Sequence, residues 1–207
     1  MAPDANLGRS DGHPVLILPG FAADDGSTAP LRWAVRSHGY SAHGWRLGRN
    51  VGPTARVVAG LRDRVEQLGR AHGRRVSVVG WSLGGVYARA LARERPELVG
   101  QVINLASPFR SFEPSPAPLA VPATSIYTRT DGVTSWQNCI DRTGPRAENI
   151  EVFGTHTGLG VNPAVILAVL DRLSQPEDDW QPFRPPWWAH CSYPEPETWS
   201  ADAPRFA

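Results

Sequence analysis

The chain has 207 residues, and its 21 lysines and arginines nearly balance its 20 aspartates and glutamates. This length fits a single domain, and the balanced charge without a basic run argues against a nucleic-acid partner. The longest apolar stretches, such as 15–18 and 164–170, are far shorter than the roughly 20 residues of a membrane-spanning helix. We therefore expect no transmembrane segment.

Along most of the chain, short runs rich in β-branched residues alternate with amphipathic runs. This alternation is typical of the α/β class, in which crossover helices connect the strands of a mostly parallel sheet. The predicted elements are, in order, a strand at 13–18, a helix at 29–38, a strand at 41–47, a helix at 54–69, a strand at 76–79, a helix at 83–95, strands at 102–105, 124–127 and 149–153, and a helix at 163–173. A proline-rich loop is predicted between 107 and 122, and it is too short to form a cap domain.

The composition changes after Gln175. The segment Pro176–Ala207 holds seven of the 20 prolines and four of the eight tryptophans. Disordered tails are usually poor in aromatic residues, because they bury too little apolar surface to offset the entropy of ordering. We therefore predict one domain over 1–175 and an extended strap over 176–207 that packs on it. A free tail and a partner-binding surface are the alternatives.

The first residues lack the basic region and the apolar core of a secretory signal. We expect a cytoplasmic protein, with secretion as the alternative if a leader has been removed. The two cysteines, Cys139 and Cys191, are too few to indicate a disulfide scaffold. One bridge and two free thiols both remain open.

The most informative motif is the pentapeptide 80–84, Gly-Trp-Ser-Leu-Gly, which follows a predicted strand and precedes a predicted helix. A tight turn of this kind holds a serine hydroxyl above the edge of the sheet, at the start of the helix. We expect side chains at Gly80 or Gly84 to collide with the neighbouring strand or helix. The motif therefore predicts Ser82 as a nucleophile, and the alternative is a glycine-rich turn without chemistry.

A serine nucleophile needs a base to take its proton and a carboxylate to orient that base. His156 lies on the loop after the strand 149–153 and is the predicted base, whereas His13 opens the first strand, at the wrong end of the sheet. Asp131 follows the strand 124–127 and is the predicted acid. Asp141 is the alternative acid, and a solvated surface carboxylate is the ordinary interpretation of it.

Two backbone N–H groups are needed to bind the oxyanion of the reaction. One is predicted at Leu83, directly after the nucleophile, and the other at Phe21, in the loop after the first strand. We expect an open substrate groove lined by four aromatic side chains, although Trp81 is also a candidate for packing beside the sheet. These four are Phe21, Trp81, Phe109 and Phe112.

These motifs resemble the α/β-hydrolase superfamily, in particular its small lipases and carboxylesterases without a lid. The resemblance covers about 15–173 and rests on 18–21 (Leu-Pro-Gly-Phe), 80–85, Asp131 with Gly132, and His156 with 158–160. It implies an α/β-hydrolase fold without a cap domain and a Ser-His-Asp esterase or lipase, with no metal or organic cofactor. From the open groove we expect short- to medium-chain esters, either small-molecule or lipid esters, as substrates. An acyltransferase with the same triad and a non-catalytic binding protein on this scaffold are the alternatives.

Overall fold

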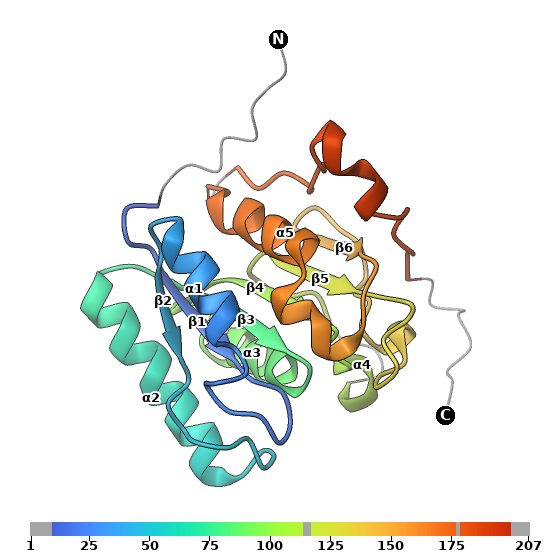
Figure 1. Cartoon of the computed structure of the whole chain (residues 1–207). Coiled ribbons are helices and arrows are strands. Elements are labelled where there is room, and N and C mark those ends of the chain that lie inside the picture. The colour runs from blue at the N-terminus through green and yellow to red at the C-terminus, as the bar shows by residue number, and fades with distance from the viewer. Residues whose placement is uncertain (1–9, 114–116, 177–178, 200–207) are drawn as a thin grey trace.

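The computed structural model describes residues 10–113, 117–176 and 179–199. Its described strands form one sheet in the order β2-β1-β3-β4-β5-β6, and every neighbouring pair is parallel (Figure 1). The strands are β1 (Pro14–Leu18), β2 (Ser41–Gly44), β3 (Val76–Trp81), β4 (Val99–Leu105), β5 (Ala123–Tyr127) and β6 (Ala147–Glu151). The predicted α/β class with a parallel sheet is confirmed.

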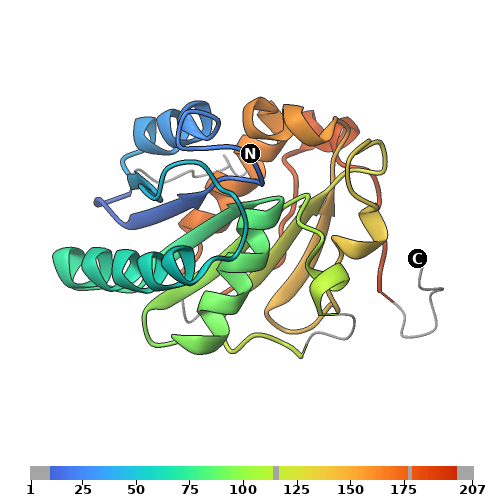
Figure 2. The ribbon, with the colours of Figure 1, turned by 90° about the horizontal axis from the view of Figure 1, so that it is seen from below.

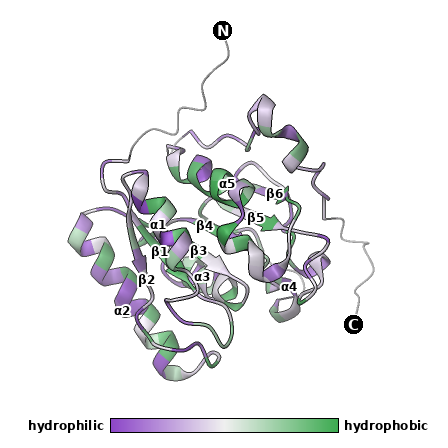
Figure 3. Ribbon diagram, viewed as in Figure 1, coloured by the Kyte–Doolittle hydropathy of each residue, from purple (hydrophilic) through white to green (hydrophobic). Residues whose placement is uncertain are grey.

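Helices cover both faces of the sheet, as Figure 2 shows. Because successive side chains of a strand point to opposite faces, Val15 and Ile17 belong to one apolar cluster and Leu16 and Leu18 to the other. The first cluster includes side chains of α1 (Ala29–Ser37) and α5 (Pro163–Ser174), and the second includes those of α2 (Ala55–His72) and α3 (Leu83–Glu94). Figure 3 shows the polar outer side of α2.

Shorter helices lie in the connections: α4 (Phe109–Phe112) and the 3₁₀ helices η1 (Trp136–Asn138), η2 (His156–Val161) and η3 (Trp187–Ser192). The single turn α4 forms where only a loop was predicted. Within the described ranges no cap domain covers the sheet, and no helix there is long and apolar enough to cross a membrane.

Strand β2 ends at Gly44, three residues before the predicted end. The main-chain N–H groups of Trp45 and Arg46 donate to the carboxylate of Asp25 over 2.9 and 3.1 Å. Arg46 also has a φ of 61°, in the left-handed region that no strand contains. The strand stops because a remote carboxylate captures the N–H groups that would extend it.

The described part of the strap contacts the domain. Trp180 is buried, and the guanidinium of Arg172, on α5, lies 5.5 Å from its ring centroid. The N–H of Phe183 donates to Glu148 of β6 over 2.7 Å, and the hydroxyl of Tyr193 donates to a main-chain oxygen of α5 over 2.7 Å. Residues 177–178 and 200–207 of the predicted strap lie outside the described residues.

Candidate active site

Ser82 forms the turn between β3 and α3, with φ 53° and ψ −123°. This is a rare conformation for a residue with a side chain, and it costs about 1–3 kcal/mol. The turn is held by three hydrogen bonds: Ser82 N donates to Leu105 O over 2.8 Å, and Ser82 O accepts from Gly85 N over 3.0 Å and from Ser107 Oγ over 2.7 Å. The surrounding structure therefore imposes the strain on Ser82.

The glycines around Ser82 allow β1, β3 and α3 to approach closely. A Cβ atom on Gly80 would lie 2.3 Å from the Cα of Gly85, and one on Gly84 would lie 2.5 Å from the carbonyl oxygen of Leu18. These are the predicted collisions with the neighbouring helix and strand. The motif is therefore required by packing as well as by the turn.

His156 and Asp131 are directly bonded. His156 Nδ1 lies 2.8 Å from Asp131 Oδ2, and the main-chain N–H of His156 donates to Asp131 O over 3.0 Å. Both side chains are buried. The second carboxylate oxygen, Oδ1, accepts from Thr134 N over 2.6 Å, Thr134 Oγ1 over 3.0 Å and Val133 N over 3.0 Å.

These bonds set the charge state of Asp131. Burial alone would raise the pKa of its carboxyl, but the hydrogen bonds from His156, Thr134 and Val133 outweigh burial, and the pKa is lowered from its ordinary value. The carboxylate is therefore ionised at neutral pH and can hold the imidazole in one orientation.

Asp141 was expected to be a solvated surface carboxylate, and this prediction is wrong. Its side chain is buried, with Oδ2 2.5 Å from Arg89 Nη1 of α3. The side chain of Asn149 accepts from Asp141 N over 2.7 Å and donates to Asp141 O over 2.8 Å. Asp141 thus neutralises a buried arginine, and Asp131 is the carboxylate that bonds to His156.

The loop after β1 lies against the serine. A Cβ atom on Gly20 would be 3.1 Å from Ser82 Cβ and 3.7 Å from Ser82 Oγ. Among the described residues, the main-chain N–H groups of Phe21 and Leu83 have no hydrogen-bond acceptor. Neither of the two predicted oxyanion donors is therefore engaged by another group of the described residues.

The loop after β1 is held in place by Asn50, which is fully buried. Asn50 Nδ2 donates to Pro19 O over 3.0 Å, and its Oδ1 accepts from Tyr87 Oη over 3.1 Å. Nothing in the sequence pattern distinguishes Asn50 from an ordinary loop residue.

The four predicted groove residues have different surroundings. Phe21 and Phe112 are 66% and 60% exposed. Phe109 is 2% exposed and lies against the guanidinium of Arg89, so its ring does not face an open groove as we expected. Trp81 packs against the apolar core, and its indole N–H donates to His156 O over 3.1 Å. The alternative of core packing therefore describes Trp81 better.

Trp81 also connects the nucleophile turn to the loop of His156. Its ring lies so close to Gly160 that a Cβ there would be 2.7 Å from a ring atom. In the part of the chain that the structure describes, Ser82 Oγ forms no hydrogen bond with His156. Without a substrate such bonds are often long, and they shorten in the enzyme–substrate complex.

No family model matches the chain. Several solved structures are similar over most of its length. A protein of unknown function from Agrobacterium tumefaciens matches with a TM-score of 0.61 and 15% identity, covering 89% of each chain. A metagenome-derived lipolytic enzyme matches with a TM-score of 0.59 and 15% identity over 76% of this chain and 92% of its own. The α/β-hydrolase domain-containing protein 10 from mouse matches with a TM-score of 0.56 and 16% identity over 76% of this chain and 86% of its own.

The chain has the α/β-hydrolase fold. The carboxyl ends of its parallel strands bring the turn of Ser82 and the loops of Asp131 and His156 to one edge of the sheet. This is the edge at which open α/β sheets bind ligands.

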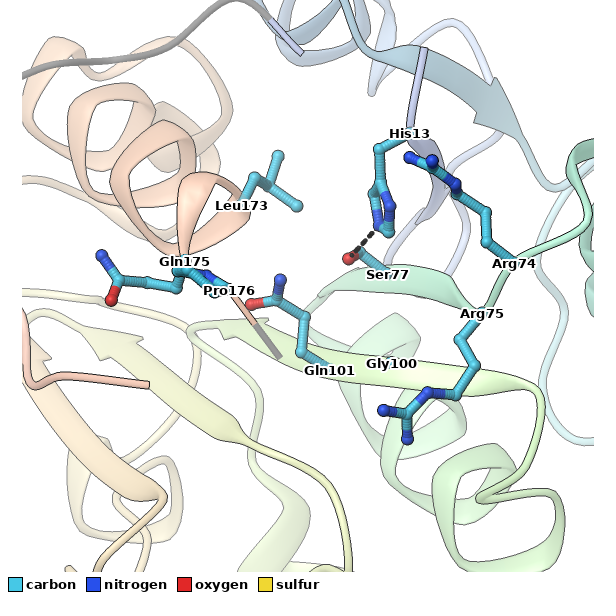
Figure 4. A pocket seen from close by; sticks show the side chains of 9 residues that line it. All are labelled: His13, Arg74, Arg75, Ser77, Gly100, Gln101, Leu173, Gln175 and Pro176. Atoms are coloured by element: carbon cyan, nitrogen blue, oxygen red, sulfur yellow. Dashed lines mark hydrogen bonds between the residues drawn. The ribbon is translucent and has the colours of Figure 1, made fainter. Parts of the chain in front are cut away.

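At the opposite edge of the sheet, a serine and a histidine are in hydrogen-bond contact (Figure 4). His13 Nε2 is 2.8 Å from Ser77 Oγ, beside a hollow of about 420 Å³ that Arg74, Arg75 and Gln101 also line. Ser77 is 1% exposed and lies in β3, directly after the shift in the register between β3 and β4 at Val76. Ser77 has no positive φ and lies within a strand, whereas Ser82 lies on the strained turn, so Ser82 remains the candidate nucleophile.

Ser107 and Thr134 support the candidate site, although neither was predicted from the sequence. Ser107 holds the carbonyl of Ser82, and Thr134 holds Asp131. A signal for the turn at Asp131 existed, because an Asp followed by Gly favours a turn in which the Asp side chain accepts from the backbone N–H two residues on, here that of Val133. No comparable signal preceded Ser107.

Both cysteines are free thiols, which decides between the two open alternatives. Burial raises the pKa of Cys139 to about 12, and its Sγ lies 3.5 Å from Thr134 Oγ1. Among the described residues, no three His, Cys, Asp or Glu side chains are placed to bind a metal ion.

Proposed function

We propose that this protein is a serine hydrolase of carboxylic esters, with Ser82 as nucleophile, His156 as base and Asp131 as acid. The observation that carries the proposal is the 2.8 Å bond between His156 Nδ1 and Asp131 on the same sheet edge as the strained turn of Ser82. Strain of this kind persists only where the surrounding structure imposes it, and it concentrates at functional sites.

The bond to Asp131 determines which nitrogen of His156 does the chemistry. Because Nδ1–H faces the carboxylate, Nε2 is the nitrogen that accepts the proton of Ser82 Oγ. Oγ then forms a bond to the ester carbonyl carbon, and the carbonyl oxygen becomes an oxyanion. His156 Nε2–H returns the proton to the departing alcohol, which leaves an acyl group on Ser82. Water, activated by the same nitrogen, releases the acid.

The oxyanion is bound by the main-chain N–H groups of Phe21 and Leu83. Support comes from their lack of any acceptor in the described residues and from the position of Leu83 at the start of α3, where the helix dipole favours negative charge. Removing one such donor from other enzymes slows the reaction about 10²–10³-fold.

The exposed apolar side chains support an apolar ester as substrate. Six of them lie in segments that follow the carboxyl ends of strands, on the edge that holds the candidate site, and are Phe21, Val51, Phe112, Val133, Phe153 and Val161. Exposed apolar groups collected on one edge indicate a surface that contacts apolar ligands. We propose short- to medium-chain acyl esters, in keeping with the lipolytic enzyme among the similar structures.

A series of p-nitrophenyl esters from C2 to C12 tests the proposal on the wild type, Ser82→Ala and Ser77→Ala. Ser77→Ala is the matched control, because it removes the serine hydroxyl that is in hydrogen-bond contact with His13. We expect Ser82→Ala to lose at least about 10⁴-fold in kcat, and Ser77→Ala to stay within a few fold of the wild type. Hydrolysis that persists in Ser82→Ala would exclude this serine as the nucleophile.

A further inference from the structure

The last described residues of the strap contact the loop that carries Asp131, and Figures 1 and 2 both show them side by side. The N–H of Glu197 donates to Tyr127 Oη over 2.6 Å, and its carbonyl accepts from Asn149 Nδ2 over 3.3 Å. Tyr127 ends β5, so this attachment lies where the acid loop begins. The carboxylate of Glu197 also lies 3.0 Å from Arg129 Nη2, two residues before Asp131.

The same contacts join the ends of β5 and β6. Arg129 Nε lies 3.0 Å from both carboxylate oxygens of Glu151, and Tyr127 Oη donates to Glu151 Oε2 over 2.8 Å. Glu151 ends β6, whose exit loop carries His156. Glu197 therefore bonds to a network that fixes the spacing between the loops of Asp131 and His156.

Trp199 makes the second contact. Two guanidinium groups lie over its ring, that of Arg110 4.4 Å and that of Arg142 4.5 Å from the ring centroid. It also packs against the buried cluster that includes Cys139. Cys139 Sγ lies 3.5 Å from the hydroxyl of Thr134, which donates to Asp131 Oδ1 over 3.0 Å. A continuous packed path thus leads from Trp199 to the carboxylate.

We infer that Glu197 and Trp199 are positioning residues, through which the strap holds Asp131 in line with His156. This inference rests on the proposed serine-hydrolase function. Other tryptophans of the strap are arranged differently: Trp187 and Trp188 are 78% and 59% exposed on η3. We therefore assign the positioning role to the last described residues of the strap and not to tryptophans of the strap in general.

Trp199→Ala tests the inference, with Trp187→Ala as the matched tryptophan of the same strap and Trp199→Phe as the conservative variant. Because a displacement of about 1 Å at a reacting group can cost about 10²-fold, we expect Trp199→Ala to lower kcat about 10- to 100-fold. KM should stay within about twofold, since Trp199 does not line the proposed groove. Trp187→Ala should match the wild type, and Trp199→Phe should recover most of kcat.

Proton NMR gives a readout that does not need turnover. The Nδ1 proton shared by His156 and Asp131 should give a downfield resonance in the wild type, Trp187→Ala and Trp199→Phe, and the resonance should broaden or vanish in folded Trp199→Ala. An unchanged resonance together with an unchanged kcat in Trp199→Ala would overturn the inference. The inference would also be overturned if kcat of Trp199→Ala fell only in proportion to the fraction of the variant that is folded.

The two proposals fail separately. If Ser82→Ala abolishes turnover while Trp199→Ala behaves like Trp187→Ala, the hydrolase function stands and the positioning role is wrong. If the wild type hydrolyses no ester, the resonance still decides whether the strap positions Asp131.

Discussion

Two buried aspartates near the candidate site have different partners. Asp131 bonds to His156, and Asp141 forms an ion pair with Arg89 whose two side chains are only 4% and 1% exposed. Neutralising Asp131 should affect mainly catalysis, and neutralising Asp141 should affect mainly the stability of the fold.

We expect Asp131→Asn to lower kcat by about 10⁴-fold, since the amide cannot hold the same tautomer of His156. Ester hydrolysis and thermal unfolding, measured on the same preparation, test this expectation. Activity near that of the wild type in Asp131→Asn would remove Asp131 from the triad.

Asp141→Asn should lower the free energy of unfolding by about 3–5 kcal/mol, because it leaves the guanidinium of Arg89 buried without its counter-charge. Denaturant unfolding of the variant, with Asp131→Asn as control, gives the value. An undiminished stability would show that the ion pair contributes little to folding.

Acid should destabilise the protein partly through Asp131. Its pKa is lowered in the folded protein from an ordinary value of 3.8. As the pH falls, the Asp131 carboxylate is therefore protonated in the unfolded chain before it is protonated in the folded protein. The stability that the ionised Asp131 contributes is complete above pH 3.8 and is lost as the pH falls through the lower pKa of the folded protein. Between about pH 5 and 3, the wild type should lose more unfolding free energy than Asp131→Asn. Parallel losses in the two proteins would contradict this.

At the scale of the elements, the contact between β1, β3 and α3 depends on missing side chains. A methyl group on Gly84 would lie 2.5 Å from a backbone atom of β1, and the strand cannot move away without disturbing the sheet. A methyl group on Gly69, within α2, would have no neighbour closer than 3.7 Å. Gly84→Ala should destabilise by about 1–3 kcal/mol, and Gly69→Ala should stabilise by about 0.5–1 kcal/mol. Urea unfolding of both variants tests the pair, and equal effects would be inconsistent with the close approach.

Sequence periodicity predicted the order and type of these elements well, because burial on one or two faces leaves a direct pattern. Their ends were less predictable. Strand β2 stops where Asp25 captures the N–H groups of Trp45 and Arg46, and a contact between residues 20 positions apart leaves no local signal. For the same reason the buried ion pair between Asp141 and Arg89, which lies 52 positions away, could not be predicted. The turn of Ser82 was predictable since its glycines, strand and helix are adjacent in sequence.

At the scale of the whole molecule, the lack of a cap domain in the part of the chain that the structure describes should determine how the protein responds to an oil–water interface. In the described residues of the connection between β4 and β5, the single turn α4 is the only helix, and Phe21 and Phe112 are already exposed. No rearrangement is then needed to uncover the proposed groove. The hydrolysis rate of tributyrin should rise smoothly through its solubility limit, and a sharp increase at that limit would indicate a covering segment.

Covalent labelling tests the proposed nucleophile most directly. A fluorophosphonate reacts with an activated serine and leaves an adduct that peptide mass spectrometry can locate. We predict one adduct, on Ser82, that forms far more slowly in Asp131→Asn and His156→Ala. A label on another residue, or an enzyme that hydrolyses esters at full rate with Ser82 unlabelled, would contradict the assignment.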